Sequence, residues 1–328
     1  MKKYIVYYDS GTTNSRIYLL DGAFNVLFTA KRPIGSRNSA MEGSNMVVIR
    51  ALRELYDEML QKSGIDEDEI GEIYGSGMLT SPYGLHEIPH LTLPVTVKDF
   101  AENVYPHFED KLLHRTINLV PGMKTVSEDI AYVNNMRGEE IEILGTLDDL
   151  EKATKSRNIA LILPGSHTHV VNVMNGDLKG IISNLTGEVF HALKTETIMA
   201  PILSKKDVTL IPEQVKKGVD NLLKFGFSRA IYICHAMRLF NVGTEDDRFS
   251  YAEGAISGCV RESLEYYCES LWQGCDTAAI VSNEYMFRAF KAVFDGSPYI
   301  KDVVWLPISD GKSYGVQGLK KIISVKNA

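Results

Sequence analysis

The chain has 328 residues, which is too many for one ordinary hydrophobic core and about right for two domains. Hydrophobic residues make up 45% and charged residues 23% of it, an ordinary globular composition. The formal net charge of −7 argues against a general nucleic-acid binder, which needs a basic surface. Phosphate-handling enzymes remain open, because a phosphate site needs only local amides and a few cations.

The sequence shows no targeting or membrane signal. The amino terminus runs from Met1 directly into a strand-like segment, with no apolar signal region and no small-residue cleavage site. No apolar run approaches the length that spans a membrane. The four cysteines show no CxxC spacing, which favours reduced thiols. We therefore expect a cytoplasmic protein without a nucleic-acid or membrane partner.

The first third of the chain predicts strands separated by polar turns, with one helix. Runs rich in β-branched and aromatic residues indicate the strands. Apolar residues recurring at helical spacing indicate the helix. The expected elements are strands at 4–8, 16–20 and 25–30, a helix at 45–63, and a strand at 70–74 that ends at Gly75-Ser76-Gly77.

The last half alternates between helical and strand patterns, which is typical of mostly parallel sheets covered by helices. Small residues such as Gly254 and Ser257 in the longest expected helix would let it approach a neighbour or a nucleotide closely. The expected helices lie near 187–203, 212–225, 250–272, 283–295 and 311–323, and the expected strands at 229–234, 277–282 and 303–307.

The sequence resembles itself when it is shifted by 154 residues without gaps. Residues 5–8 then fall on 159–162, and Asp21-Gly22 falls on Asn175-Gly176. Gly11, in the turn after the first strand, likewise falls on Gly165. Internal repeats of this kind indicate duplicated domains. We expect two similar α/β domains, residues 1–150 and 151–328, each with a mixed sheet flanked by helices, around one cleft.

The first turn has the composition of a phosphate-binding loop. Glycine lets backbone approach an anion closely, and hydroxyl and amide groups can donate to phosphate oxygens. Asp9 at the end of the strand is suited to Mg²⁺, which prefers oxygen ligands and water. A polar hairpin turn is the simpler alternative. The candidate nucleotide-binding residues are Gly11, Thr12, Thr13, Asn14 and Arg16.

The second turn repeats the donors but replaces Asp9 with Leu163. Both turns could therefore hold the phosphates of ATP, while only the first carries a carboxylate for a metal ion. The candidate residues of the second turn are Gly165, Ser166, His167 and Thr168.

One motif is excluded as a metal site. The run from His86 to His90 spells the HExxH pattern of zinc peptidases. That pattern needs both histidines on one face of an uninterrupted helix, which Pro89 prevents. We expect a loop here.

Taken together, the motifs resemble the actin/hexokinase/Hsp70 superfamily and, more closely, the 2-dehydro-3-deoxygalactonokinase family. The family pattern Asp-x-Gly-(Ser/Thr)-Thr-Asn-x-Arg is matched by Asp9–Arg16, and its most specific motif, Met-Arg-Gly-Glu-Glu, by Met136–Glu140. The remaining matches are Gly77-Met78, Pro121-Gly122-Met123, Leu144-Gly145, Pro164–His167 and Thr186–Val189.

The resemblance implies a duplicated actin-like ATPase fold, with ribonuclease H-like domains around a central cleft. It implies that the protein uses ATP and Mg²⁺ to phosphorylate 2-dehydro-3-deoxy-D-galactonate to its 6-phosphate. Residues 1–150 would hold the sugar acid, and residues 151–328 the adenosine. The sequence leaves a homodimer open.

The resemblance also directs attention to the acids near the domain junction, where this superfamily commonly places its catalytic base. Glu139 is our candidate for the base that takes the proton of the substrate hydroxyl, with Glu140 and Asp129 as alternatives. Arg137 could clamp the sugar-acid carboxylate with its planar guanidinium. From the residues alone, an exposed charged helix terminus is the simpler interpretation. The expected substrate-binding residues are Gly77, Met78, Arg137 and Glu140.

The chain departs from the family pattern in places. Ser10 stands where members usually carry Trp, and the lysine of the second turn is absent from Ser166–His169. The turn at Ser282-Asn283-Glu284 lacks the expected glycine. Two alternatives therefore stay open: a kinase for another sugar or polyol, and a non-catalytic nucleotide- or sugar-sensing protein of the same fold.

Overall fold

The computed structural model describes residues 3–309 and 313–327. The chain divides into two compact units: unit 1 comprises Met1–Asp148 and Asp310–Ala328, and unit 2 comprises Asp149–Ser309. No helix in the described ranges has the length and apolar character that crossing a membrane requires.

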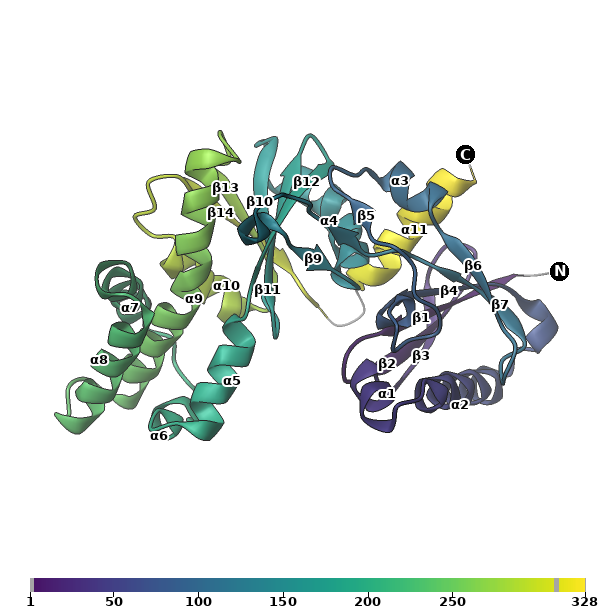
Figure 1. The fold of residues 1–328 in the computed structure, drawn as a ribbon, viewed down its shortest axis with the longest axis horizontal. Coiled ribbons are helices and arrows are strands. Elements are labelled where there is room, and N and C mark those ends of the chain that lie inside the picture. Colours follow the sequence, from purple (N-terminus) through teal and green to yellow (C-terminus); the bar gives the residue numbers. More distant parts are fainter. Residues whose placement is uncertain (1–2, 310–312, 328) are drawn as a thin grey trace. The chain divides into compact units, whose positions relative to one another are not determined.

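A mixed sheet forms the centre of unit 1 (Figure 1). Its strands are β1 (Tyr4–Ser10), β2 (Ser15–Leu20), β3 (Val26–Arg32), β4 (Ile70–Gly77), β6 (Tyr105–Glu109) and β7 (Arg115–Leu119). They lie in the order β3-β2-β1-β4-β7-β6. The first three form an antiparallel meander, β4 and β7 extend the sheet in parallel, and β6 closes it antiparallel to β7. A small separate sheet joins β5 (Leu91–Thr92), β8 (Met123–Lys124) and β9 (Asn135–Met136).

Helices cover both faces of the larger sheet. Alternate residues of a strand point to opposite faces. Tyr8 accordingly packs in the core formed with α2, whereas the hydroxyl of Tyr7 lies near Gly315 of α11. The helices of this unit are α1 (Ser36–Glu42), α2 (Met46–Ser63), α3 (Val97–Glu102), α4 (Glu139–Ala153) and α11 (Tyr314–Lys326).

The last helix joins unit 1 because glycines let it pack closely against α4. A Cβ on Gly145 would lie 1.9 Å from the carbonyl oxygen of Tyr314, and one on Gly318 would lie 1.9 Å from that of Ile141. The ammonium group of Lys321 in α11 also pairs with Asp148. The sequence analysis assigns all of 151–328 to the second domain, whereas α11 packs within unit 1. The start of this helix was expected at 311, which lies outside the described residues.

Unit 2 repeats the mixed sheet with fewer strands. They are β10 (Asn158–Leu163), β11 (Thr168–Met174), β12 (Asp177–Asn184), β13 (Thr277–Ser282) and β14 (Asp302–Pro307). Their order is β12-β11-β10-β13-β14, with an antiparallel meander followed by two parallel strands. The expected α/β class, with mixed sheets flanked by helices, is confirmed.

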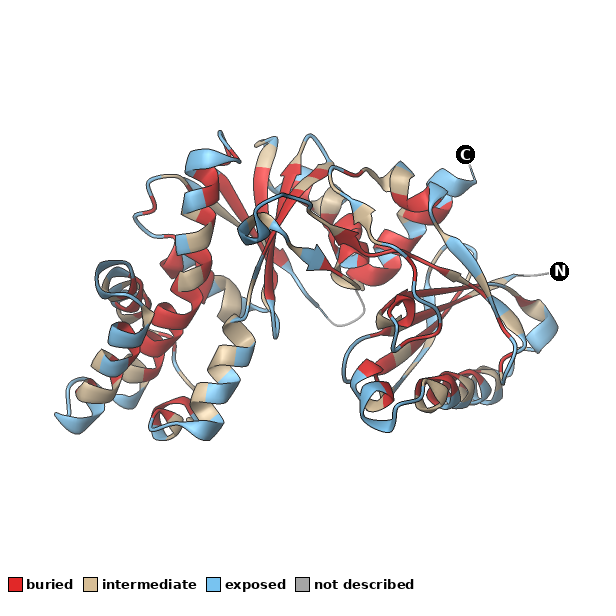
Figure 2. Cartoon of the chain, viewed as in Figure 1, coloured by how far each residue is buried: buried red, intermediate tan, exposed pale blue. Residues whose placement is uncertain are grey.

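Two layers of helices accompany this second sheet. The first layer is α9 (Glu245–Ser270) and α10 (Glu284–Val293), and α7 (Pro212–Phe225) and α8 (Phe227–Leu239) pack on α9. Figure 2 shows buried residues along α9 and the strands, while α5 (Thr186–Glu196) has no fully buried residue. Gly254 makes the close helix contact that we expected, because a Cβ there would lie 2.0 Å from the carbonyl oxygen of Val215 in α7. A further short helix is α6 (Ala200–Leu203).

The expected strand at 229–234 is wrong, since these residues belong to α8. The buried residues of this segment are Ala230, Ile231, Cys234 and Met237, a helical spacing that packs one face on α9. The expected helix at 187–203 is divided into α5 and α6, with Thr197 extended between them.

The duplication is present in the two meanders, down to a matching irregularity. A register shift occurs at Leu19/Leu20 in the first meander and at Asn172/Val173 in the second. The gap-free alignment is nevertheless inexact. Asp9 pairs with Arg16, whereas Leu163 pairs with His169, so the second turn is one residue shorter.

Candidate functional site

The first turn is held by the helix that follows the meander. The Gly11 amide donates to the Asn14 carbonyl at 2.8 Å and closes the turn. Amides of residues 36–37, at the start of α1, donate to the carbonyls of Gly11 and Thr12 at 3.2 and 3.0 Å. Gly35 approaches so closely that a Cβ there would lie 2.4 Å from the Gly11 carbonyl oxygen. The carbonyl side of the turn is therefore occupied by protein.

The opposite side of the same turn is open. A Cβ on Gly11 would meet only the Asn14 carbonyl oxygen, at 3.9 Å. Thr12 and Thr13 are exposed, and the Thr13 hydroxyl accepts from the Asn14 amide at 2.8 Å. The turn thus presents hydroxyl and amide groups to a ligand, as the sequence predicts for a phosphate site.

The second turn has the same support. A Cβ on Gly187, at the start of α5, would lie 2.2 Å from the Gly165 carbonyl oxygen. The Glu188 amide donates to the Ser166 carbonyl at 3.0 Å. Gly165, Ser166 and His167 are exposed. Thr168 is buried, and its hydroxyl shares a 2.6 Å hydrogen bond with that of Thr186.

Asp9 is the penultimate residue of β1 and lies next to a cation. Nη1 of Arg16 lies 3.8 Å from Oδ2 of Asp9 and donates to the Tyr18 hydroxyl at 3.0 Å. On its other side, β1 places Asp9 opposite Ser76 of β4. Burial raises the pKa of Asp9, and the charge of Arg16 opposes that shift. The side chain stays 35% exposed, so a ligand can reach it.

Two glycines bring the start of α4 against the ends of β1 and β4. Gly77 has a φ of +71°, and a Cβ there would lie 2.4 Å from the Ser10 carbonyl oxygen. Gly138 has a φ of +120°, and its Cβ would lie 3.3 Å from the Gly77 Cα. Both positions need glycine for backbone conformation and for space. Met78, next to Gly77, begins a single 3₁₀ turn (Met78–Thr80).

The acids at the start of α4 differ in their surroundings. Glu140 is fully buried, with Oε2 accepting from the Gly138 amide at 2.6 Å. Its Oε1 has no hydrogen-bond partner within the described ranges, and burial raises the pKa of this carboxyl to about 8. Glu139 is partly exposed at the first position of the helix, where the helix dipole favours a negative charge.

Glu142, which the sequence analysis did not consider, lies close enough to Asp9 to interact with its charge. Desolvation and the negative charges of Asp9 and Glu139 raise its pKa to about 7. The residue itself remains exposed. Its position three residues after Glu139, on the same side of a helix, was a signal available in the sequence.

Arg137 bonds to the protein itself. Its Nη1 donates to the carbonyl and the hydroxyl of Thr80. Its Nη2 donates to the Ile88 carbonyl at 3.3 Å and to Nδ1 of His90 at 3.1 Å. The guanidinium therefore fixes the loop whose sequence matches the HExxH pattern. As expected, this segment is not helical. Asp129 is exposed and caps a 3₁₀ turn by accepting from the Ala131 amide at 2.9 Å.

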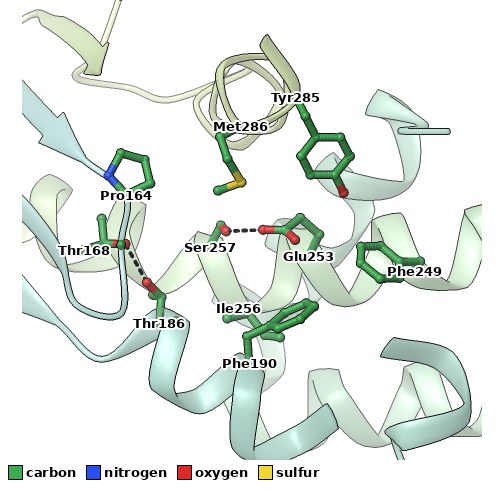
Figure 3. A pocket seen from close by; sticks show the side chains of 12 residues that line it. Pro164, Thr168, Thr186, Phe190, Phe249, Glu253, Ile256, Ser257, Tyr285 and Met286 are labelled. Atoms are coloured by element: carbon green, nitrogen blue, oxygen red, sulfur yellow. Dashed lines mark hydrogen bonds between the residues drawn. The ribbon is translucent and has the colours of Figure 1, made fainter. Parts of the chain in front are cut away.

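Unit 2 contains a cavity of about 390 Å³ beside the second turn (Figure 3). This volume is in the range of small-molecule sites. Its walls come from the second turn, α5, α9 and α10. The lining residues are Pro164, Gly165, Thr168, Thr186, Gly187, Phe190, Phe249, Glu253, Ile256, Ser257, Tyr285 and Met286.

The cavity has a donor-rich end and an apolar body. The hydroxyls of Thr168 and Thr186 lie at the end formed by the turn. Phe190, Phe249 and Met286 contribute apolar surface further along. The sequence analysis placed adenosine in this half of the chain but did not name the apolar side chains of Phe190, Phe249 and Met286, because they come from separate helices and meet only in the fold.

Comparisons with known proteins bear on most of the chain. A family described as 2-keto-3-deoxy-galactonokinase matches residues 9–301. A protein of Rhizobium meliloti (strain 1021), named probable 2-dehydro-3-deoxygalactonokinase DgoK1, is 23% identical over 203 residues. That match covers 61% of this chain and 59% of the relative, so this chain spans less than two thirds of the relative's length.

Solved structures support the fold. A Sinorhizobium meliloti protein described as a 2-dehydro-3-deoxygalactonokinase superposes with a TM-score of 0.74, at 16% identity, over 98% of both chains. Acetate kinase of Porphyromonas gingivalis superposes with a TM-score of 0.50, at 9% identity, over 98% of this chain and 99% of its own. The expected actin-like ATPase fold is confirmed.

Proposed function

Because the chain belongs to the 2-keto-3-deoxy-galactonokinase family, a family of sugar-acid kinases that use ATP, we propose that it phosphorylates 2-dehydro-3-deoxy-D-galactonate to its 6-phosphate. One observation in the structure carries the proposal. Gly77 and Gly138 place the acidic start of α4 beside the end of β1, where Asp9 and the first turn lie. Phosphoryl transfer depends on such a set of positioned acids and phosphate-binding groups.

We assign candidate nucleotide-binding groups within each unit separately. The cavity of unit 2 would take the nucleoside, since its apolar walls suit a planar base and its donor-rich end suits phosphate oxygens. The turn at Gly165–Thr168 would bind phosphate there, and the turn at Gly11–Asn14, with Arg16, would serve the transferred group.

Asp9 and Glu142 would hold Mg²⁺. Two carboxylates that repel each other suit a hard divalent cation, which prefers oxygen ligands. Among the described residues, Arg16 is the cation that offsets the repulsion between Asp9 and Glu142. When bound, the ion neutralises charge that develops on the transferred phosphoryl group.

Glu139 remains our choice for the general base. It starts α4, and its side chain reaches solvent, so a substrate hydroxyl could approach it. Glu140 has no access to solvent, and Asp129 is used to cap a turn. Gly77 and Met78 would line the sugar-acid site, with Glu140 supporting the helix behind them. Since its guanidinium is bonded to Thr80, Ile88 and His90, we propose that Arg137 positions this loop instead of clamping the substrate carboxylate.

A coupled assay of ADP release across a panel of acceptors tests the function. The panel holds 2-dehydro-3-deoxy-D-galactonate, its gluconate epimer, D-galactonate without the keto group, and neutral sugars and polyols. We expect the highest kcat/KM with the first acid. Preference for a neutral sugar or polyol would identify a different kinase, and ATP binding without any acceptor would favour a sensor.

A further inference from the structure

The cavity of unit 2 contains a buried carboxyl group and a buried hydroxyl group, and the hydroxyl has no partner within the described ranges. Glu253 of α9 is only 7% exposed, and its Oε1 accepts from the Ser257 hydroxyl at 2.7 Å. The Tyr285 hydroxyl is buried and has no hydrogen-bond partner within the described ranges. Figure 3 shows this hydroxyl pointing from α10 toward the α9 side of the cavity, where the Glu253 carboxyl lies. An acceptor and a donor are therefore available close together.

Such an arrangement is costly for an empty pocket. Buried polar groups in folded proteins almost always have partners, and an orphaned hydroxyl loses the hydrogen bonds that water gave it. Burial raises the pKa of Glu253, and the Ser257 hydroxyl only partly offsets that shift. Burial raises the pKa of Tyr285, and the negative charge of Glu253 adds to that shift. A ligand with one donor and one acceptor would satisfy both side chains.

We propose that Glu253 and Tyr285 select the nucleoside of the phosphoryl donor. The Glu253 carboxylate accepts a hydrogen bond from the nucleoside, and the Tyr285 hydroxyl donates one to it. This inference rests on the proposed function, since it takes the cavity as the nucleoside site. It goes further by naming the side chains that distinguish one nucleoside from another.

The dimensions and the charge agree with a nucleoside. The cavity runs along α9, where successive turns of the helix carry Phe249, Glu253 and Ser257. At about 1.5 Å per residue, the distance along the helix from Phe249 to Ser257 is about 12 Å. With phosphates at Thr168 and Thr186, a ribose and a base would lie along Ser257, Glu253 and the aromatic walls. A sugar acid is a poor occupant, because its carboxylate would meet the buried Glu253.

Two parts of a nucleoside offer the required donor and acceptor. Adenine carries an amino group beside a ring nitrogen, and ribose carries hydroxyl groups that both donate and accept. The chemistry is the same in both cases, so the two sources are distinguished by analogues. Purine riboside triphosphate lacks only the amino group, and 2′-deoxy-ATP and 3′-deoxy-ATP each lack one hydroxyl.

The test is isothermal titration of the full-length protein with ATP and these three analogues, in the absence of a sugar acid. The variants are Tyr285→Phe, which removes a hydroxyl that has no partner among the described residues, and Glu253→Gln. Glu284→Gln, an exposed acid on α10 outside the cavity lining, is the matched control. We expect the parent and the control to bind ATP about ten- to a hundredfold more tightly than one kind of analogue.

Both cavity variants should lose most of that preference. If the variants no longer discriminate against purine riboside triphosphate, Glu253 and Tyr285 bind the base. If they no longer discriminate against the deoxy analogues, the two side chains bind the ribose. Should Glu253→Gln fail to fold, Tyr285→Phe still decides. Equal affinity of the parent for all four compounds, no ATP binding, or variants that keep the preference would overturn the inference. ATP selectivity without phosphorylation of any acid would refute the proposed function alone.

Discussion

Gly11 of the first turn and Gly35 at the start of α1 lie against each other, but only Gly35 is required by the fold. A Cβ on Gly35 would collide with two backbone carbonyls, whereas Gly11 has open space. Gly35→Ala should therefore lower the free energy of unfolding by about 2 kcal/mol, the usual effect of overpacking. Gly11→Ala should stay within about 0.5 kcal/mol of the parent and yet weaken nucleotide binding, because its Cβ would meet the phosphates.

Urea unfolding and nucleotide titration of both variants check this prediction. Unchanged nucleotide affinity in Gly11→Ala would remove the first turn from the phosphate site while leaving the fold description intact.

The buried carboxyl of Glu140 predicts a pH dependence of stability. Its folded-state pKa of about 8 exceeds the ordinary value of 4.5, so the folded protein keeps a proton that the unfolded chain releases. The stability that this proton provides is complete below pH 4.5 and is lost as the pH rises through 8. Within that window the loss is about 1.4 kcal/mol per pH unit.

Glu140→Gln has no proton to lose, so its stability relative to the parent should increase between pH 5 and pH 8.5. Urea unfolding at both pH values measures the difference, with the exposed Asp129→Asn as control. If the difference between Glu140→Gln and the parent is the same at both values, Glu140 is not protonated in the folded protein.

Asp9 and Glu142 give a prediction about the metal ion. Asp9→Asn should lose most Mg²⁺-dependent turnover while sugar-acid binding remains, because the ion acts on the transferred group. Glu142→Gln should raise the Mg²⁺ concentration needed for half-maximal activity. Activity measured against Mg²⁺ concentration tests both. A Glu142→Gln curve that overlays the parent's would remove this residue from the metal site.

Local sequence was sufficient to propose the residues of the two turns and the acids Glu139 and Glu140 as candidates. The same local pattern could not show that the Arg137 guanidinium bonds to Thr80 and Ile88, because these partners are about fifty residues away. Phe190, Glu253 and Tyr285 were missed for a similar reason. They lie on three helices with no common motif, and only the fold brings them into one cavity.

At the level of elements, the contact between α4 and α11 is the most sensitive to side-chain size. Gly318→Ala would place a Cβ 1.9 Å from the Ile141 carbonyl oxygen, so the helices must separate. We expect a loss of about 2 kcal/mol in unfolding free energy or more. Gly22→Ala is the matched control, since nothing lies within 4 Å of its Cβ.

Thermal unfolding of the two variants measures the difference. A Gly318→Ala protein as stable as the Gly22→Ala protein would show that α11 contributes little to unit 1.

The segment at 229–234 shows why one element was assigned to the wrong class. Arg229–Cys234 is a short apolar run with β-branched residues, which strands and buried helices share. The structure continues the helix to Leu239 and buries Ala230, Cys234 and Met237 on α9. Tertiary packing on a neighbouring helix, which the segment itself does not encode, decided between the two.

At the level of the whole molecule, the two meanders share topology while their chemistry has diverged. Each supports its turn with a glycine at the start of the next helix, Gly35 in unit 1 and Gly187 in unit 2. The position of Asp9 in the first meander corresponds to that of Leu163 in the second, which is buried and apolar. The sequence predicted this broken symmetry. It could not predict that the second turn is one residue shorter, because the shift is visible only in the strand pairing.

Transfer of labelled phosphate is the most direct test of the central claim. The protein is incubated with Mg²⁺, [γ-³²P]ATP and 2-dehydro-3-deoxy-D-galactonate, and the products are separated by chromatography. We predict that the label enters a sugar-acid phosphate, and that Glu139→Gln, which keeps ATP and Mg²⁺ binding, reduces the rate by about 10²- to 10⁴-fold. The account would be contradicted if the label were found only in inorganic phosphate, or if the protein bound ATP but left it unreacted.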